Sequence, residues 1–350
     1  MRGRIWALTA LIVVGALTAL GCRAAESASA AKPVAGPEHV RGVEQTLLTY
    51  PEWFLVFSPH EYAQFIAANP PSRFPFYGHV AQFWAGYKAV YDETRRRELA
   101  LNPGYHLMIM VIGTSTTVEY ALKSAYESLV GRLSESVAGS PTLEERYAAD
   151  VATEYVRFIR VLPWYEFDFA KALAGLWFDT PVLGPDMIRK WERRFALTTE
   201  YAIKMGYAKL IKLATKSIYD EPLLVTAVVA QPRPVAGATM PDLKLLQTLP
   251  GDGVLLTVPR YEAFTVYAQS MADQGVDFRE IAGNGSFILV SVLAPGEWKP
   301  TDPATPLLSQ PILTRPGMQR VLLVLPVMHL GEALRQWKAA KLEVEHVFDY

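Results

Sequence analysis

The chain has 350 residues, of which 51% are hydrophobic and 20% are charged, as in a globular protein with room for two domains. Lys and Arg number 34 against 35 Asp and Glu, so the chain lacks the basic excess of nucleic-acid-binding proteins, and we expect no nucleic-acid partner. Its single cysteine, Cys22, excludes a disulfide within the chain.

Residues 1–22 have the layout of an export signal. Arg2 and Arg4 precede the uncharged apolar run Ile5–Gly21. The run ends in Ala19-Leu20-Gly21-Cys22, which resembles the lipobox of bacterial lipoprotein signals, where a small residue precedes the cysteine. This resemblance implies that Cys22 is the lipid-attachment residue and becomes the mature N-terminus. The alternative is an uncleaved anchor, since the apolar run approaches the length of a membrane span.

Both alternatives tether the chain to a membrane through its N-terminus. The basic residues precede the apolar run and should stay inside the cell, so the remainder is expected to face the periplasm or the exterior. We therefore predict a membrane-anchored protein of the bacterial cell envelope. Residues 23–37 are rich in Ala, Ser and Pro without any periodicity, which is typical of a flexible linker.

Residues 38–220 show helical patterns and are expected to form a helical domain. Its central helix is predicted over Tyr105–Leu133. The apolar residues at helical spacing in this helix are expected to face inward: Leu107, Val111, Val118, Ala121, Leu122, Ala125, Leu129 and Leu133. A second line of small residues, Gly113, Thr117, Ser124 and Gly131, is expected to let another backbone approach closely. A later long helix begins after Gly184-Pro185, and its expected inward face comprises Met187, Ile188, Trp191, Phe195, Tyr201, Met205, Ala208 and Ile211.

Two basic clusters interrupt the helical domain. They are Arg95-Arg96-Arg97 and the set Arg189, Lys190, Arg193 and Arg194. We interpret each as a solvated helix face. The alternative, for a protein close to a membrane, is contact with anionic lipid headgroups.

Residues 221–350 change to strand patterns and contain an internal repeat. Val254–Pro259 matches Val321–Pro326, and in each copy a helix and an alternating strand follow. Two βαβ units around one sheet resemble the ferredoxin-like fold, with both helices on one face. The predicted fold class is thus α+β, a helical domain followed by a smaller ferredoxin-like α/β domain. Pro295–Pro316, with its prolines and lack of periodicity, is expected to be an irregular connection.

The sequence does not identify catalytic residues. The histidines of the helical domain lack the three- or four-residue spacing of a helical metal site, so neither a metal nor a cofactor is expected. A pocket could still combine His79, His106 and Glu119, although Glu119 also pairs naturally with Lys123 four residues on. The hydroxyls of Thr114–Thr117 fit neither a nucleophile elbow nor a phosphate loop, and we expect them to bond back to the preceding turn or to a neighbouring helix.

Three functional hypotheses follow. The first is a membrane-tethered envelope protein with a binding or scaffold role, its partners being the membrane and a further protein. The second is an envelope enzyme with a site near His79, His106 and Glu119; bringing these side chains together would favour it. The third is a ligand-sensing module in the α/β domain.

Overall fold

The computed structural model describes residues 33–215, 225–235 and 240–350. The expected signal, the lipid-attachment residue Cys22 and most of the linker lie outside these residues. The fold is mixed α+β, with helices dominating the N-terminal part and two four-stranded antiparallel sheets in the C-terminal part. Within the described residues, the chain divides into two compact units, which we call the helical unit (55–77 and 103–215) and the α/β unit (33–54, 78–102, 225–235 and 240–350).

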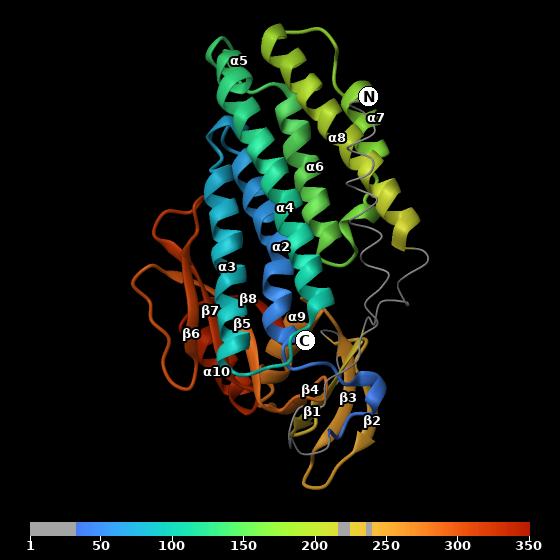
Figure 1. Cartoon of the computed structure of the whole chain (residues 1–350), viewed down its shortest axis with the longest axis vertical. Helices are drawn as coiled ribbons and strands as arrows, with labels where there is room; N and C mark the ends of the chain where they lie inside the picture. Colours follow the sequence, from blue (N-terminus) through green and yellow to red (C-terminus); the bar gives the residue numbers. More distant parts are fainter. Residues whose placement is uncertain (1–32, 216–224, 236–239) are drawn as a thin grey trace. The chain divides into compact units, whose positions relative to one another are not determined.

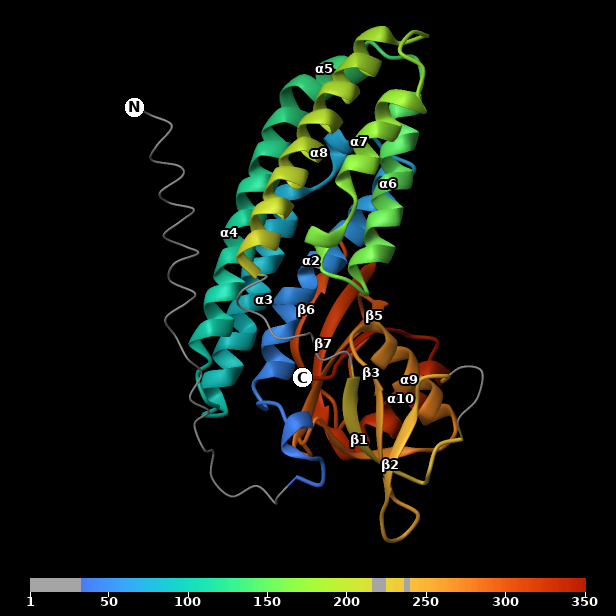
Figure 2. The ribbon, with the colours of Figure 1, turned by 90° about the vertical axis from the view of Figure 1, so that its right-hand side faces the viewer.

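The helical unit is built mainly from four helices that run alongside one another (Figure 2). They are α4 (Pro103–Tyr126), α6 (Leu143–Ile159), α7 (Phe169–Phe178) and α8 (Met187–Thr215). The shorter elements are the second half of α2 (Gln45–Ile66), η2 (Pro71–Arg73), the π-helical turn η3 (Glu127–Gly131), α5 (Arg132–Ser136) and η4 (Trp164–Glu166).

Local sequence signals explain where two of these helices begin. Thr142 and Glu145 form a reciprocal capping box at the start of α6. Asp168 accepts a hydrogen bond from the backbone of Lys171 and caps α7. The apolar core of this part is aromatic, with Phe167, Phe169 and Tyr201 packed among α6, α7 and α8.

The central helix forms as predicted, but the predicted inward face is wrong. The helical path continues from α4 through η3 into α5, and Val118, Leu122, Leu129 and Leu133 on it are exposed. The buried residues follow a different helical line, in which polar and small side chains are frequent: His106, Ile109, Gly113, Thr116, Tyr120, Glu127, Gly131 and Ser134.

The first half of α8 inverts the prediction in the same way. Ile188, Trp191 and Phe195 were expected inside and are exposed, whereas Tyr201 and Ala208 are buried as expected. The basic cluster Arg189, Lys190, Arg193 and Arg194 was expected to be solvated, and all four side chains are buried. Charges therefore lie inside this end of the unit, and large apolar side chains lie outside.

The α/β unit contains the same β-β-β-α-β sequence of elements twice (Figure 1). The first copy comprises β1 (Val225–Gln231), β2 (Lys244–Thr248), β3 (Val254–Pro259), α9 (Glu262–Asp273) and β4 (Asp277–Ile281). The second comprises β5 (Phe287–Pro295), β6 (Thr305–Pro311), β7 (Met318–Pro326), α10 (Leu330–Ala339) and β8 (Glu343–Phe348). Between β7 and α10 lies η5 (Val327–His329).

Each copy forms its own sheet, in the orders β2-β3-β1-β4 and β6-β7-β5-β8. The structure thus has two sheets where the sequence analysis expected one. Strand β1 pairs antiparallel with both β3 and β4, so α9 connects two parallel strands that have β1 between them. The second sheet repeats this arrangement around β5. Strand β6 occupies part of Pro295–Pro316, so the prediction of an irregular connection is wrong there.

One apolar core joins the two copies. Helices α9 and α10 contact each other, and each also contacts strands of both sheets. Fully buried side chains such as Phe264, Phe278, Ile288 and Leu323 form this core. Residues 33–54 and 78–102 group with this unit, including η1 (Pro37–His39), the first half of α2 and most of α3 (Phe76–Arg96).

Candidate functional site

The three residues considered for a catalytic pocket do not share one. His106 and Glu119 both lie on α4, thirteen positions apart, and the rise of an α-helix separates them by roughly 20 Å. His79 belongs to the α/β unit, where its ring contacts Phe54 edge-on. Burial, together with the nearby Arg320, lowers the pKa of His79 to about 3, so its imidazole is neutral at physiological pH.

Glu119 belongs to an ion-pair quartet between α4 and α8. Lys123 bridges Glu119 at 3.0 Å, as predicted from their spacing, and also Glu200 at 2.9 Å. Lys204 contacts Glu200 at 2.8 Å and Glu119 at 3.4 Å. Burial favours the protonated form of Glu200, but the two lysines outweigh it and hold the pKa of Glu200 well below its usual range. Two lysines opposite two carboxylates make the quartet neutral overall and join the two helices.

The hydroxyl run of α4 also has a structural role. Ser115 donates to the carbonyl of Val111 at 2.9 Å, and Thr117 donates to that of Gly113 at 2.7 Å. Both bonds return to the preceding turn, which confirms the prediction for these two residues.

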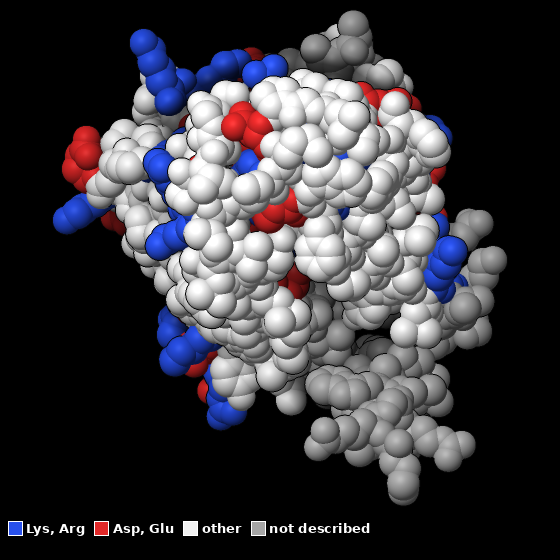
Figure 3. Space-filling model, turned by 90° about the horizontal axis from the view of Figure 1, so that it is seen from above, with Lys and Arg blue, Asp and Glu red and all other residues white. Residues whose placement is uncertain are grey.

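The most unusual surface of the helical unit lies at the end where α5 and α7 finish and α6 and α8 begin. We call it the apolar end and define it by its exposed large apolar side chains: Leu129, Leu133, Val137, Leu143, Phe178, Val182, Leu183, Met187 and Ile188. Five of them, Leu129, Leu133, Phe178, Leu183 and Ile188, are each at least 67% exposed. In the view onto this end, uncharged side chains dominate, and most Lys and Arg lie at the periphery (Figure 3).

Beneath the apolar end lies a set of buried charges that we call the charge network. It contains four cations and four carboxylates: Arg189, Lys190, Arg193, Arg194, Glu127, Glu144, Glu145 and Glu192. The carboxylates come from η3, α6 and α8, so the network connects elements that are distant in the sequence. Formal charges balance within it, as burial of ionised groups requires.

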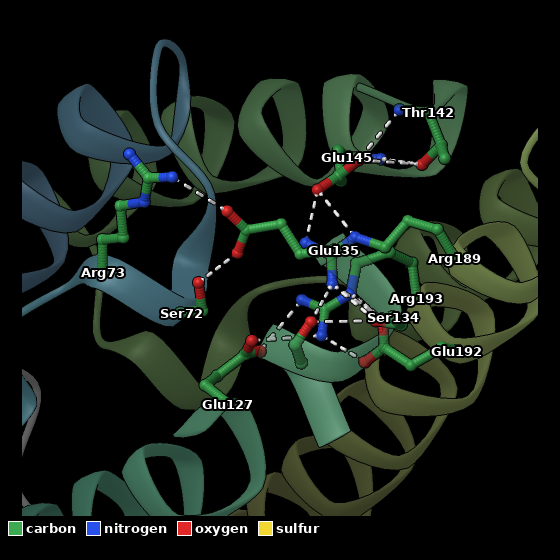
Figure 4. A network of polar contacts seen from close by, with 11 residues as sticks. Ser72, Arg73, Glu127, Ser134, Glu135, Thr142, Glu145, Arg189, Glu192 and Arg193 are labelled. Carbon is green, nitrogen blue, oxygen red and sulfur yellow. Dashed lines mark hydrogen bonds and ion pairs between the residues drawn. The ribbon is translucent and has the colours of Figure 1, made fainter. Parts of the chain in front are cut away.

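One half of the charge network is centred on Arg189 and Arg193 (Figure 4). Arg189 donates to Glu145 at 2.6 Å, to Glu192 at 3.0 Å and to the main-chain oxygen of Gly131 at 3.0 Å. Arg193 forms a fork with Glu127, at 2.9 and 3.2 Å, and also pairs with Glu192. Burial raises the pKa of Glu127 even though Arg193 acts to lower it.

Gly131 supports this half of the network through its lack of a side chain. A Cβ at this position would meet the carboxylate of Glu127, which Arg193 holds in place. The absence of a Cβ at Gly131, the last residue of the π-helical turn η3, therefore leaves room for the Glu127 side chain beside its own helix.

The other half is centred on Glu144, whose side chain is fully buried. Its Oε1 atom contacts Lys190 Nζ at 2.8 Å and Arg194 Nε at 2.9 Å. Arg194 also donates to the main-chain oxygens of Thr180 and Pro181, at 2.7 and 3.1 Å. These bonds fasten the segment between α7 and α8, which carries Val182 and Leu183, to the interior of the bundle.

A shallow open depression adjoins the apolar end. Its volume is about 580 Å³, and it is lined by Ser72, Arg73, Arg132, Glu135 and Ser136. Glu135 accepts hydrogen bonds from Ser72 and from Arg73, the latter at 3.2 Å (Figure 4). Arg132 is exposed and directly precedes the exposed Leu133.

The sequence pattern identified the cations of this site, but their predicted placement on a solvated face is wrong. Arg189, Lys190, Arg193 and Arg194 were recognised as a cluster, while their carboxylate partners on η3 and α6 were not. The sequence signal that could have revealed the buried side is the spacing of Glu127, Gly131 and Ser134. These residues continue the small and polar line of the central helix. The four-residue spacing of exposed Val118 and Leu122 marks the opposite side.

The carboxylates of the site serve as partners for cations. In the part of the chain that the structure describes, His, Cys, Asp and Glu do not gather in groups of three that could hold a metal ion. Across residues 33–215, 225–235 and 240–350, no helix combines the length and hydropathy needed to cross a bilayer. Comparison of the chain with known protein families, with curated protein sequences and with solved structures finds no match.

Proposed function

We propose that this chain is a membrane-tethered protein of the bacterial cell envelope that acts as a binding or scaffold protein through the apolar end of its helical unit. The observation that carries the proposal is the inverted placement of side chains there, with Arg194 and Glu144 buried and Phe178 and Leu183 exposed. Monomeric soluble proteins rarely expose a large contiguous apolar patch, and such patches mark interaction sites. The roughly 20 Å between His106 and Glu119 further favours a binding protein over an enzyme with those residues in one pocket.

The tether is the N-terminal part of the proposal. The basic start, the apolar run Ile5–Gly21 and the Gly21-Cys22 junction support a lipoprotein signal with lipid on Cys22. For the α/β unit we propose a relationship to the ferredoxin-like fold at the level of each sheet, supported by the two β-α-β crossovers that have a strand between their parallel strands.

Photo-crosslinking in intact cells tests the binding role. The side chains of Leu133 and Phe178 are replaced, one at a time, by p-benzoylphenylalanine in the full chain. Arg157, exposed on α6 of the same unit, provides the control position. We expect covalent adducts from the two positions of the apolar end and none from Arg157. An absence of adducts at Leu133 and Phe178, or equal adducts at Arg157, would refute the binding role.

Metabolic labelling tests the tether. Labelled palmitate should enter the parent chain, and Cys22→Ser should abolish both the label and signal processing. If Cys22→Ser changes neither labelling nor size, the lipoprotein hypothesis is wrong and the uncleaved anchor replaces it.

A further inference from the structure

We propose that the apolar end inserts into one leaflet of a lipid bilayer, with anionic headgroups held at its rim by Arg73 and Arg132. This inference rests on the binding role proposed above and specifies the chemistry of the partner. It concerns partial insertion of the end of a bundle, because none of the described helices is suited to cross a membrane.

The kind of side chain exposed at the apolar end supports insertion into lipid. Phe178, Leu183 and Ile188 lie near the segment that joins α7 to α8, and each is at least 67% exposed. Leu129, Leu133 and Val137 add an exposed apolar strip from η3 through the end of α5. Water is a poor solvent for such a surface, whereas hydrocarbon chains solvate it well.

The placement of positive charge in the same region also supports insertion. Arg189, Arg193 and Arg194 begin α8 beside the exposed Ile188 and Phe195, yet the guanidinium groups turn inward and pair with carboxylates. Buried ion pairs contribute little net stability compared with apolar packing. Their use here keeps these guanidinium groups away from the surface, as expected of cations in protein that contacts lipid.

A pair of tryptophans lies at the border of the apolar end. Trp177 and Trp191 are partly exposed, and their ring centroids lie 6.1 Å apart. The indole of Trp177 donates to Thr198 at 3.0 Å, and the guanidinium of Arg194 lies 5.2 Å from its ring centroid. Tryptophan is enriched at membrane–water interfaces, where one side of the ring is apolar and the other polar.

The rim of the apolar end carries exposed positive charge. Arg73 is 67% exposed at its side chain and Arg132 is also exposed, and both line the depression of about 580 Å³ beside Leu133. Glu135 offsets one of these positive charges, and Asp179 is an exposed acid near Phe178. Two cations beside an apolar surface complement the phosphate of an anionic headgroup.

The same rim disfavours a second copy of this chain as the partner. A two-fold interface would place the same surface patch on both sides, so that Arg73 and Arg132 of the two copies would share one interface. Like charges brought together in this way oppose association. The apolar run Ile5–Gly21 of the same chain, by contrast, is suited to a lipid environment.

Depth-dependent fluorescence quenching tests the proposal on the full chain reconstituted into vesicles. Leu183→Cys and Ile188→Cys each receive an environment-sensitive fluorophore, and lipids with a nitroxide on the acyl chain act as quenchers. Val235→Cys is the matched control, since Val235 is an equally exposed apolar residue (73% against 74% for Leu183) in the α/β unit. The parent chain, labelled in parallel, gives the contribution of Cys22.

We expect most of the emission at Leu183 and Ile188 to be lost, with little change at Val235. Quenching should be stronger in vesicles of phosphatidylcholine with phosphatidylglycerol than in phosphatidylcholine alone, and Arg73→Gln combined with Arg132→Gln should remove that difference. Equal quenching in the two kinds of vesicle would overturn the headgroup part of the proposal.

Unquenched probes at Leu183 and Ile188, or equal quenching at Val235, would overturn insertion itself. If Leu133 and Phe178 then crosslink to a protein, including a second copy, the binding role survives and the lipid partner is refuted. If they crosslink to nothing, the binding role fails as well. The two failures are therefore distinguishable.

Discussion

The two units of this protein place charged and apolar side chains in opposite ways. In the α/β unit, Phe278 and Leu323 are fully buried in a core that joins both sheets. In the helical unit, Arg194 and Glu144 are fully buried, while Leu133 and Phe178 at its apolar end are 70% and 86% exposed. One sequence thus contains a conventional water-soluble core and a bundle whose end presents apolar groups outward.

The difference is what the proposed contact of the helical unit with lipid requires. Burial of apolar area drives folding when the outside is water, and the α/β unit follows that rule. The helical unit forgoes part of the stabilisation that apolar burial would give it, because Leu129, Leu133 and Phe178 stay exposed. It is held together at this end by forked hydrogen bonds between Arg and Glu, which depend on geometry more than on area.

The largest expected effect comes from breaking the charge network. Glu144→Ala removes the carboxylate that faces Lys190 and Arg194, which would remain buried without it. Uncompensated burial of charge predicts a loss of about 3–5 kcal/mol in the free energy of unfolding. Urea denaturation in detergent, followed by circular dichroism, measures it. As a control, Asp92→Asn in the exposed pair with Lys88 should change the free energy by less than about 1 kcal/mol.

Leu323→Ala provides the counterpart in the α/β unit. Leu323 on β7 is fully buried, so truncation removes apolar contacts and leaves a cavity. The expected loss in the free energy of unfolding is about 2–5 kcal/mol by the same measurement. A loss below 1 kcal/mol (less than the usual effect of a core truncation) would mean that the core of this unit does not resemble that of a water-soluble protein.

The sequence predicted the helices better than it predicted which face of each helix is buried. Helical periodicity in Tyr105–Leu133 correctly indicated a helix, but two lines run along it, one of Leu and Val and one of small and polar residues. The Leu line was expected to face inward, which assumed water outside, and the exposure of Leu122 and Leu133 shows the opposite placement. The small-residue line was expected to pack closely, and its members Gly113 and Gly131 are buried. Periodicity reports that a helix has two faces and does not identify the surroundings of each.

Contacts between segments distant in the sequence were equally hard to predict. The repeat of Val254–Pro259 at Val321–Pro326 indicated duplicated elements, while the separation into two sheets depends on which strand edges pair. Strand β6 was not predicted because Pro306 and Pro311 are unusual in strands. Proline is tolerated there because β6 is an edge strand. The charge network was missed because Glu127 lies 66 residues from Arg193 and Glu144 lies 50 residues from Arg194 along the chain.

An acid titration separates the ion-pair quartet from the rest of the fold. Lys123 and Lys204 lower the pKa of Glu200 despite its burial, so Glu200 adds stability at pH values above its unfolded pKa of about 4.3. That stability is lost as pH falls through the lower pKa of the folded state, with a slope of at most about 1.4 kcal/mol per pH unit. Urea denaturation from neutral to acid pH should show a shallower slope for Glu200→Gln.

The matched control for this titration is Glu166→Gln, which alters the half-exposed pair with Lys212 in the same unit. Its acid slope should equal that of the parent chain. If Glu200→Gln and Glu166→Gln give the same slope, the quartet does not contribute to acid sensitivity.

The smallest expected effect concerns a leucine that sequence patterning would place in a core. Leu122 on α4 is 68% exposed, so Leu122→Gln removes little buried area and should change the free energy of unfolding by no more than about 0.5 kcal/mol in detergent. The matched substitution Leu323→Gln should unfold the α/β unit, because it buries an amide without a partner. A loss of several kcal/mol for Leu122→Gln would mean that another protein surface covers this side of α4. In that case the two units would differ in their partners and not in their solvent, and the contrast between them would need a protein interface as its explanation.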